Sequence, residues 1–329
     1  MKANLPNGAL LLGALVLSMV GATWRGAPAP AGAVLRSAAA PPPGATEVTD
    51  ARGQAVPVGD YQRIASLNAV ADHLLLHLVE PERLVLVTGH SATAHPDAFR
   101  FGGRPTAATS AEIEEVLALQ PDLVVASIFT DEAWLARLRE AGVAVFDLGD
   151  MRGTSTTLAN IDALGALLDQ RPRAARLRDR YSLQLRALED AVPPEAALPG
   201  LYVTIYGDAI FGGTTGSSYA DLLRLAGVSD VAADAGYVAW PQYSVEQLLS
   251  LDPPLVITQQ GMASVLCGHS SLGVLAACQP GGRVVEVPGH FDSDPGLGIV
   301  HGAHALQRIL HPERAPAAAW SPPGEDVAP

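Results

Sequence analysis

Basic charge, aromatic side chains and catalytic signatures are all scarce in this chain of 329 residues. Its 21 Lys and Arg residues are outnumbered by 34 Asp and Glu, which gives a formal net charge of −13. This balance argues against nucleic acid as a partner, because phosphate binding needs a basic face. The sequence also lacks the GxxxxGK[ST], GxGxxG and GxSxG patterns of nucleotide sites and serine hydrolases. A secreted enzyme is therefore the least favoured class, and we expect neither catalysis nor a cofactor.

Long hydrophobic runs are limited to residues 9–22, which follow Lys2. This run is shorter than the roughly 20 apolar residues that a membrane-spanning helix needs, so residues 1–22 are interpreted as a secretory signal. No cysteine lies near the run, which argues against a lipid anchor. We expect a periplasmic protein that does not span the membrane after cleavage. An uncleaved N-terminal anchor is the alternative.

Cysteine is almost absent, with Cys267 and Cys278 as the only pair. In an exported chain two such residues are candidates for a disulfide, which would close a short loop. Two reduced, buried thiols are the alternative. A metal site is not indicated, because no Cys-x-x-Cys pattern is present.

Between an Ala/Pro-rich tether at 23–45 and a flexible tail at 313–329, the chain alternates short apolar strands with amphipathic helices. This alternation predicts an α/β fold with two doubly wound lobes and mainly parallel sheets, at 46–153 and 197–312. The strands are expected at 63–67, 84–88, 122–126, 143–147, 201–206, 254–258 and 283–287, with a weaker one at 228–232. Residues 154–196 should link the lobes through a single long helix that begins near Pro172 and carries an apolar stripe at Leu177, Tyr181, Leu185 and Leu188.

The two predicted lobes share a sequence pattern. EEVLALQPDLVV at 114–125 matches EQLLSLDPPLVI at 246–257, and Glu114 and Glu246 stand seven positions before the aligned prolines. In both, a helix ends before proline and a buried strand follows. The lobes are therefore related units, and a cleft between them is the expected ligand site.

These motifs give the chain a resemblance to the periplasmic binding proteins of iron-siderophore, haem and cobalamin ABC importers. VTDARGQAVPV followed by RIASL resembles the opening hairpin of that family, while SSYADLLRLAGV and WPQYSVEQLLSLDPPLVIT resemble its C-terminal lobe. The resemblance implies a monomeric receptor that delivers a small-molecule metal chelate to a permease dimer. It also implies that Glu114 and Glu246 dock onto permease arginines. From their spacing alone, an equally good interpretation of Glu114 and Glu246 is that they are solvated residues near helix N-termini, where the helix dipole favours negative charge.

The ligand site is predicted from loops that follow the strands. The N-terminal lobe offers His90, His95 and Arg100, with Phe99 and Phe101 beside them, and the other lobe offers Tyr206, Phe211, Tyr237, Trp240, Tyr243 and His290. Large rings suit a planar or macrocyclic ligand such as a corrinoid, haem or ferric siderophore. Alternatively, His90, His95 and His290 could hold a free divalent metal ion, or they could be ordinary loop histidines. His73 and His77 lack the glutamate of an HExxH site and are interpreted as structural.

Overall fold

The N-terminal lobe is built on a sheet in which every strand pair is parallel. The computed structural model describes residues 38, 41–93, 96–107, 113–150, 152–207, 209–287 and 295–316. The strand order is β5-β4-β3-β6-β7. The strands are β3 (Ile64–Ser66), β4 (Leu84–Thr88), β5 (Thr106–Ala107), β6 (Leu123–Ala126) and β7 (Ala144–Asp147). A hairpin of β1 (Glu47–Thr49) and β2 (Ala55–Pro57) precedes them, as the resemblance implied.

Short helices connect these strands. They are α2 (Ala69–Leu78), α3 (Gly89–Thr93), α4 (Ile113–Ala118) and α5 (Glu132–Glu140), with 3-10 turns η1 (Pro81–Arg83) and η2 (Pro96–Phe101). Helix α2 begins at Asn68, whose side-chain oxygen accepts from the backbone amides of Val70 and Ala71. Such a cap satisfies amides that have no partner within the helix.

The C-terminal lobe has a mixed sheet of order β11-β9-β8-β12-β13, to which β10 adds by pairing with β8. Its strands are β8 (Leu198–Tyr206), β9 (Ala209–Gly212), β10 (Val228–Asp230), β11 (Gln242–Tyr243), β12 (Leu255–Thr258) and β13 (Arg283–Glu286). Strands β8, β12 and β13 pair in parallel, whereas β9 pairs antiparallel with both β8 and β11. The predicted class, α/β with mainly parallel sheets, is confirmed. The antiparallel hairpin at its edge was not predicted.

The helices of this lobe are α8 (Ser218–Leu225), α9 (Val231–Asp234), α10 (Val245–Leu251), α11 (Ala263–Gly268) and α13 (Ile299–Leu310), with 3-10 turns η3 (Pro194–Ala196) and η4 (Ala276–Cys278). Cys267 on α11 is bonded to Cys278 on η4, with their Cα atoms 5.5 Å apart. The predicted disulfide is therefore confirmed. It joins α11 to η4, which contacts β12 and β13.

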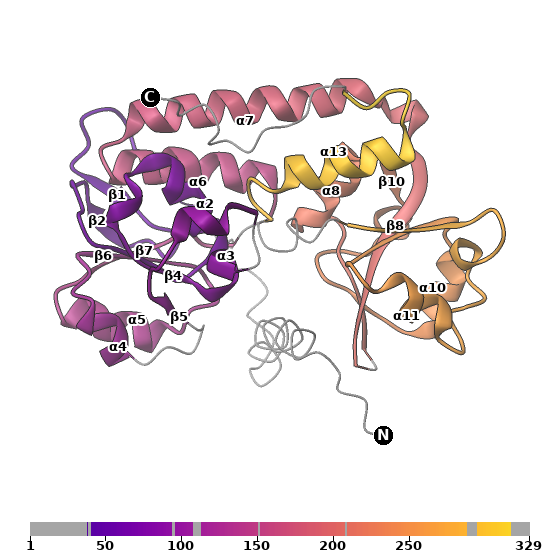
Figure 1. Ribbon diagram of the computed structural model, residues 1–329, viewed down its shortest axis with the longest axis horizontal. Helices are drawn as coiled ribbons and strands as arrows, with labels where there is room; N and C mark the ends of the chain where they lie inside the picture. The colour runs from indigo at the N-terminus through magenta and orange to yellow at the C-terminus, as the bar shows by residue number, and fades with distance from the viewer. Residues whose placement is uncertain are drawn as a thin grey trace.

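Helix α6 (Thr154–Leu167) packs on the N-terminal lobe and leads into α7 (Arg171–Ala191), which connects the two lobes. Helix α7 has 21 residues and runs along one side of the molecule, above both sheets (Figure 1). It packs on α2 and α6 of the N-terminal lobe and on α8 and α13 of the other. The predicted stripe of Leu177, Tyr181, Leu185 and Leu188 is buried.

The largest hydrophobic cluster extends through both lobes beneath α7. It includes Leu74 and Leu164 on one side and Leu223 and Leu306 on the other. Two smaller clusters lie on the opposite faces of the two sheets. Because a continuous apolar contact joins the lobes, large independent motion of one against the other is not expected.

The predicted signal at 1–22 and most of the tether and tail lie outside the described residues, so the proposed domain boundaries remain predictions. In the described part of the chain, no helix is both long and apolar enough to cross a membrane.

Candidate functional site

His90 follows β4 on the short helix α3, at the carboxyl end of the N-terminal sheet. The imidazole is half-buried, and burial lowers its pKa from the usual 6.5, so the neutral form is favoured. Its Nε2 atom is buried and has no hydrogen-bond partner among the described residues. A neutral imidazole with an unoccupied nitrogen is able to coordinate a metal or accept a hydrogen bond.

A buried polar network fixes α3 to the end of β4. The Thr88 hydroxyl donates to Asp72 Oδ2 at 2.5 Å, and Ser91 Oγ lies 3.0 Å from the same hydroxyl oxygen. Ser91 Oγ lies 3.4 Å from His73 Nε2, and the His73 ring packs edge-on against Phe101. His73 is therefore structural, as interpreted from the sequence. Phe101 is 1% exposed and belongs to the core, which corrects its suggested place beside the ligand.

The loop after β6 carries an exposed apolar side chain, Phe129, that was not predicted from the sequence. Phe129 is 51% exposed. Arg52 links this loop to the end of β7. Its Nη2 donates to the Thr130 carbonyl at 2.9 Å, and its Nε pairs with buried Asp147 at 2.6 Å. A pattern search could have found Phe129, because it stands three residues beyond a buried strand at the carboxyl edge of the sheet.

In the C-terminal lobe, Trp240 lies on a column of tyrosines. Its ring is 53% exposed and meets the Tyr219 ring edge-on, with centroids 5.1 Å apart. Tyr219 is in turn stacked on the buried Tyr202 at 3.7 Å. We call Tyr202, Tyr219 and Trp240 the tryptophan platform. Gly213 allows the Tyr219 ring to lie close to the backbone, because a Cβ atom at this position would lie 2.8 Å from that ring.

The other predicted aromatic residues lie around this lobe's hairpin. Tyr206, at the end of β8, donates its hydroxyl to Gln259 Oε1 at 2.8 Å and lies near Phe211, with ring centroids 6.1 Å apart. Tyr237 is half-buried and meets Tyr243 edge-on at 5.1 Å. Both Tyr206 and Tyr237 therefore present part of their rings at the surface.

Tyr243 differs from this group because only 4% of it is exposed, within the apolar cluster of the lobe. Burial, with smaller effects from Asp230 and Tyr237, raises its pKa well above 10. Its ring contacts Gly212, where a Cβ atom would lie 2.4 Å away. The structure therefore gives Tyr243 a supporting place beneath Tyr237, which corrects the expectation that it offers its ring to a ligand.

Two predicted site histidines, His95 and His290, lie outside the described residues. Within the described ranges, no group of three or more His, Cys, Asp or Glu side chains could hold a metal ion. Arg100, on η2, is placed against the far part of α2, where its Nη2 donates to the Leu76 carbonyl at 3.3 Å. It lines a pocket with α7 and is not grouped with the C-terminal aromatics.

Glu114 and Glu246 both lie in the first turn of a short exposed helix, α4 in one lobe and α10 in the other. Both helices lie away from α7 (Figure 1). Glu114 makes an exposed ion pair with Arg137 at 3.3 Å. The pKa of Glu246 is lowered by its own backbone amide and by Ser244, so its carboxylate is ionised near neutral pH.

The chain matches a family model described as "Periplasmic binding protein" over residues 105–267. A curated relative, the cobalamin-binding protein of Halobacterium salinarum, is 26% identical over 261 residues, which cover 76% of this chain and 69% of the relative.

Solved structures show the same fold. A possible iron-binding periplasmic protein of Staphylococcus epidermidis superposes with a TM-score of 0.66 at 20% identity, covering 77% of this chain and all of that one. The periplasmic haem-binding protein of Vibrio cholerae gives a TM-score of 0.65 at 20% identity, with 76% and 99% of the two chains covered.

Proposed function

Because the chain belongs to the periplasmic binding protein family, we propose that it is the substrate-binding component of an ABC importer. It captures a metal chelate of the corrinoid, haem or ferric siderophore class and carries it to a permease. The named relatives support this class, since one is a cobalamin-binding protein and another is a haem-binding protein. The observation that carries the proposal is the exposed Trp240 ring supported by Tyr219 and Tyr202.

An exposed indole held in place by two stacked rings provides a flat apolar surface at little cost in conformational entropy. Such a surface suits the face of a planar or macrocyclic ligand, which gains broad contact area when water is displaced. Tyr206, Tyr237 and Phe129 add further exposed ring surface. Tyr243 acts indirectly, by supporting Tyr237.

His90 supplies the complementary chemistry in this proposal. Its lowered pKa keeps the imidazole neutral near pH 7, and its buried Nε2 has no partner among the described residues. Neutral imidazole is a common axial ligand of haem iron. His95 and His290 remain candidates for the same role. A free divalent ion would require several histidines to converge, so we favour a chelate that brings most of its own ligands.

The proposed importer component is exported and docks onto a permease dimer. Proteins of this family are periplasmic, and we propose that residues 1–22 direct export. Glu114 and Glu246 would present one carboxylate from each lobe to a permease dimer, which favours a defined orientation and salt-sensitive association. Before docking, Glu114 must exchange its exposed partner Arg137, an ion pair of the kind that contributes about 0–1 kcal/mol.

A titration of the purified protein tests the chelate proposal. Cyanocobalamin, haemin, a ferric siderophore and Zn²⁺ are added separately, and binding is followed by calorimetry and by thermal denaturation. We expect saturable binding of at least one chelate. Saturation by Zn²⁺ alone, or by none of the four, would contradict the proposal.

The variant Trp240→Ala tests the platform itself. Loss of a central aromatic contact costs about 2 kcal/mol or more, so affinity for the chelate should fall by at least about thirtyfold. Val238→Ala is the matched control, because Val238 is exposed in the same segment. Equal affinity in the two variants would remove Trp240 from the site.

A further inference from the structure

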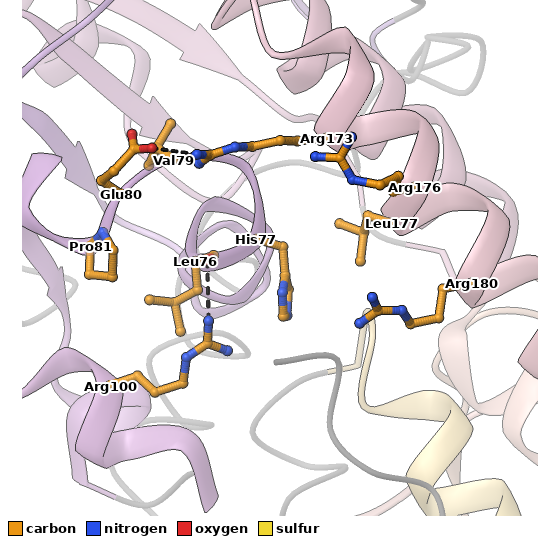
Figure 2. Close-up of a pocket in the computed structure, with 10 residues that line it drawn as sticks. All are labelled: Leu76, His77, Val79, Glu80, Pro81, Arg100, Arg173, Arg176, Leu177 and Arg180. Atoms are coloured by element: carbon orange, nitrogen blue, oxygen red, sulfur yellow. Dashed lines mark hydrogen bonds and ion pairs between the residues drawn. The ribbon is translucent and has the colours of Figure 1, made fainter. Parts of the chain in front are cut away.

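A pocket of about 560 Å³ lies between α2 and α7, beside η1 and η2 (Figure 2). This volume is within the range of about 300–1,000 Å³ that is usual for small-molecule sites. One part of its wall is apolar and the rest carries charged or polar side chains. The apolar lining residues are Leu76, Val79, Pro81 and Leu177; the others are His77, Glu80, Arg100, Arg173, Arg176 and Arg180.

Positive charge exceeds negative charge strongly around this pocket, although the chain as a whole carries −13. The described lining holds four guanidinium groups and one carboxylate. Glu80 is engaged by Arg173, which also donates to the Leu78 carbonyl at 3.3 Å. Arg176 and Arg180 form no hydrogen bond or ion pair within the described part of the chain.

The arginines on α7 share one face of the helix. Arg173, Arg176 and Arg180 recur at spacings of three and four residues, so their side chains lie along one stripe. Like charges at this spacing destabilise a helix slightly. Two other arginines of α7 are partnered: Arg178 pairs with Asp162 at 2.5 Å, and Arg171 donates to the Pro41 carbonyl at 3.1 Å. On the pocket face, in contrast, Arg176 and Arg180 have no carboxylate partner among the described residues, and Arg186, which also has none there, lies on α7 outside the pocket.

His77 lies in the wall between Arg100 and Arg180 (Figure 2). Burial is the main cause that lowers its pKa to about 3, and the positive charges of Arg100 and Arg180 lower it further. The imidazole is therefore neutral near pH 7. It can donate one hydrogen bond, or accept one, without adding a further charge to the wall.

This pocket is separate from the proposed chelate site. Helix α2 begins at the carboxyl end of β3 and runs back over the sheet. Its last residues therefore lie toward the amino ends of the strands, whereas His90 lies at their carboxyl ends. The pocket is lined by those last residues and by α7, and none of the C-terminal aromatics belongs to it.

We propose that the pocket binds a small organic polyanion, with at least two carboxylate or phosphate groups on a short hydrocarbon body. Guanidinium groups bind both kinds of anion through paired hydrogen bonds, and here they approach from two elements, η2 and α7. The apolar wall would receive the hydrocarbon part. The inference does not depend on the chelate proposal, because no residue of the tryptophan platform takes part in it.

The test is a calorimetric titration of the intact protein with citrate and with pyrophosphate, at constant ionic strength set by chloride. The two probes distinguish a carboxylate ligand from a phosphate ligand. We expect saturable binding of at least one of them. Arg180→Gln should weaken that binding by at least about tenfold, the effect of removing a hydrogen bond to a charged group. Arg176→Gln should act in the same direction.

Arg186→Gln is the matched control, since Arg186 is an exposed arginine of α7 that does not line the pocket. A second readout is the His77 imidazole resonance, identified by its loss in His77→Gln, which should shift as the anion binds. Binding of neither anion, or equal weakening by Arg180→Gln and Arg186→Gln, would overturn the proposal. Failure of the chelate titration would leave this result unaffected.

Discussion

Replacement of Asp72 by asparagine should alter how the stability of the protein depends on pH. Asp72 lies in the first turn of α2 and is 0% exposed. Its Oδ2 accepts hydrogen bonds from the Thr88 amide at 3.0 Å and the Thr88 hydroxyl at 2.5 Å. Burial raises its pKa from 3.8 to about 6, because the bonds from Ser66, Thr88 and Ser91 offset only part of the lost hydration.

The direction of this pH dependence is set by whether the folded or the unfolded state holds the Asp72 proton. Between pH 3.8 and about 6 the folded protein keeps Asp72 protonated while the unfolded chain has released that proton. Stability from this group is therefore fully present below pH 3.8 and is lost as pH rises through 6. A shift of about 2 pK units at about 1.4 kcal/mol each gives a change of about 3 kcal/mol. Asparagine keeps an acceptor for Thr88 but does not titrate.

The assay is urea-induced unfolding of both proteins at several pH values between 4 and 7. The free energy of unfolding of Asp72→Asn, relative to the wild type, should rise by about 2 kcal/mol across this range, because part of the full change lies below pH 4 and above pH 7. The comparison needs the variant, because His77 acts oppositely in the wild type: its lowered pKa gives stability that is present above pH 6.5 and lost as pH falls toward 3. A difference between the two proteins that stays constant with pH would refute the reasoning.

The remaining predictions concern the disulfide and the proposed docking residues. Replacing both Cys267 and Cys278 by serine should lower the free energy of unfolding by about 3 kcal/mol, since the bond closes a short loop; an unchanged urea midpoint would count against this. Glu114→Gln with Glu246→Gln should reduce chelate uptake by cells that also express the permease, while binding of the chelate to the purified protein stays the same. The pair Glu115→Gln and Asp234→Asn is the control, and equal uptake by both double variants would exclude a docking role.

Much of the fold could be predicted because its signals are local. Strands buried on both faces appear as continuous apolar runs, and β4, β6 and β12 were found in this way. The apolar stripe of α7 follows from helical spacing alone. Strands β9 and β11 gave no such signal, because strands of four and two residues are too short to show a periodicity. The edge strand β11 also depends on pairing with β9, which is distant from it in the sequence.

The candidate site was less predictable, because exposure depends on packing between elements. Trp240 and Tyr243 are three residues apart and both aromatic, yet one is 53% exposed and the other 4%. The difference arises from contacts with Tyr219 and Gly212, which no periodicity indicates. The arginine stripe of α7 is visible in the sequence, but the opposing Arg100 and His77 appear only when α2 and η2 pack beside it.

Anomalous scattering from crystals grown with a chelate tests the central claim most directly, because it locates the metal without assumptions about the site. The account predicts one cobalt or iron position between the two lobes, with the ring system of the ligand against Trp240 and the metal near His90 or another loop histidine of the site. A metal that lies elsewhere, for example in the arginine pocket beside α7, would contradict it.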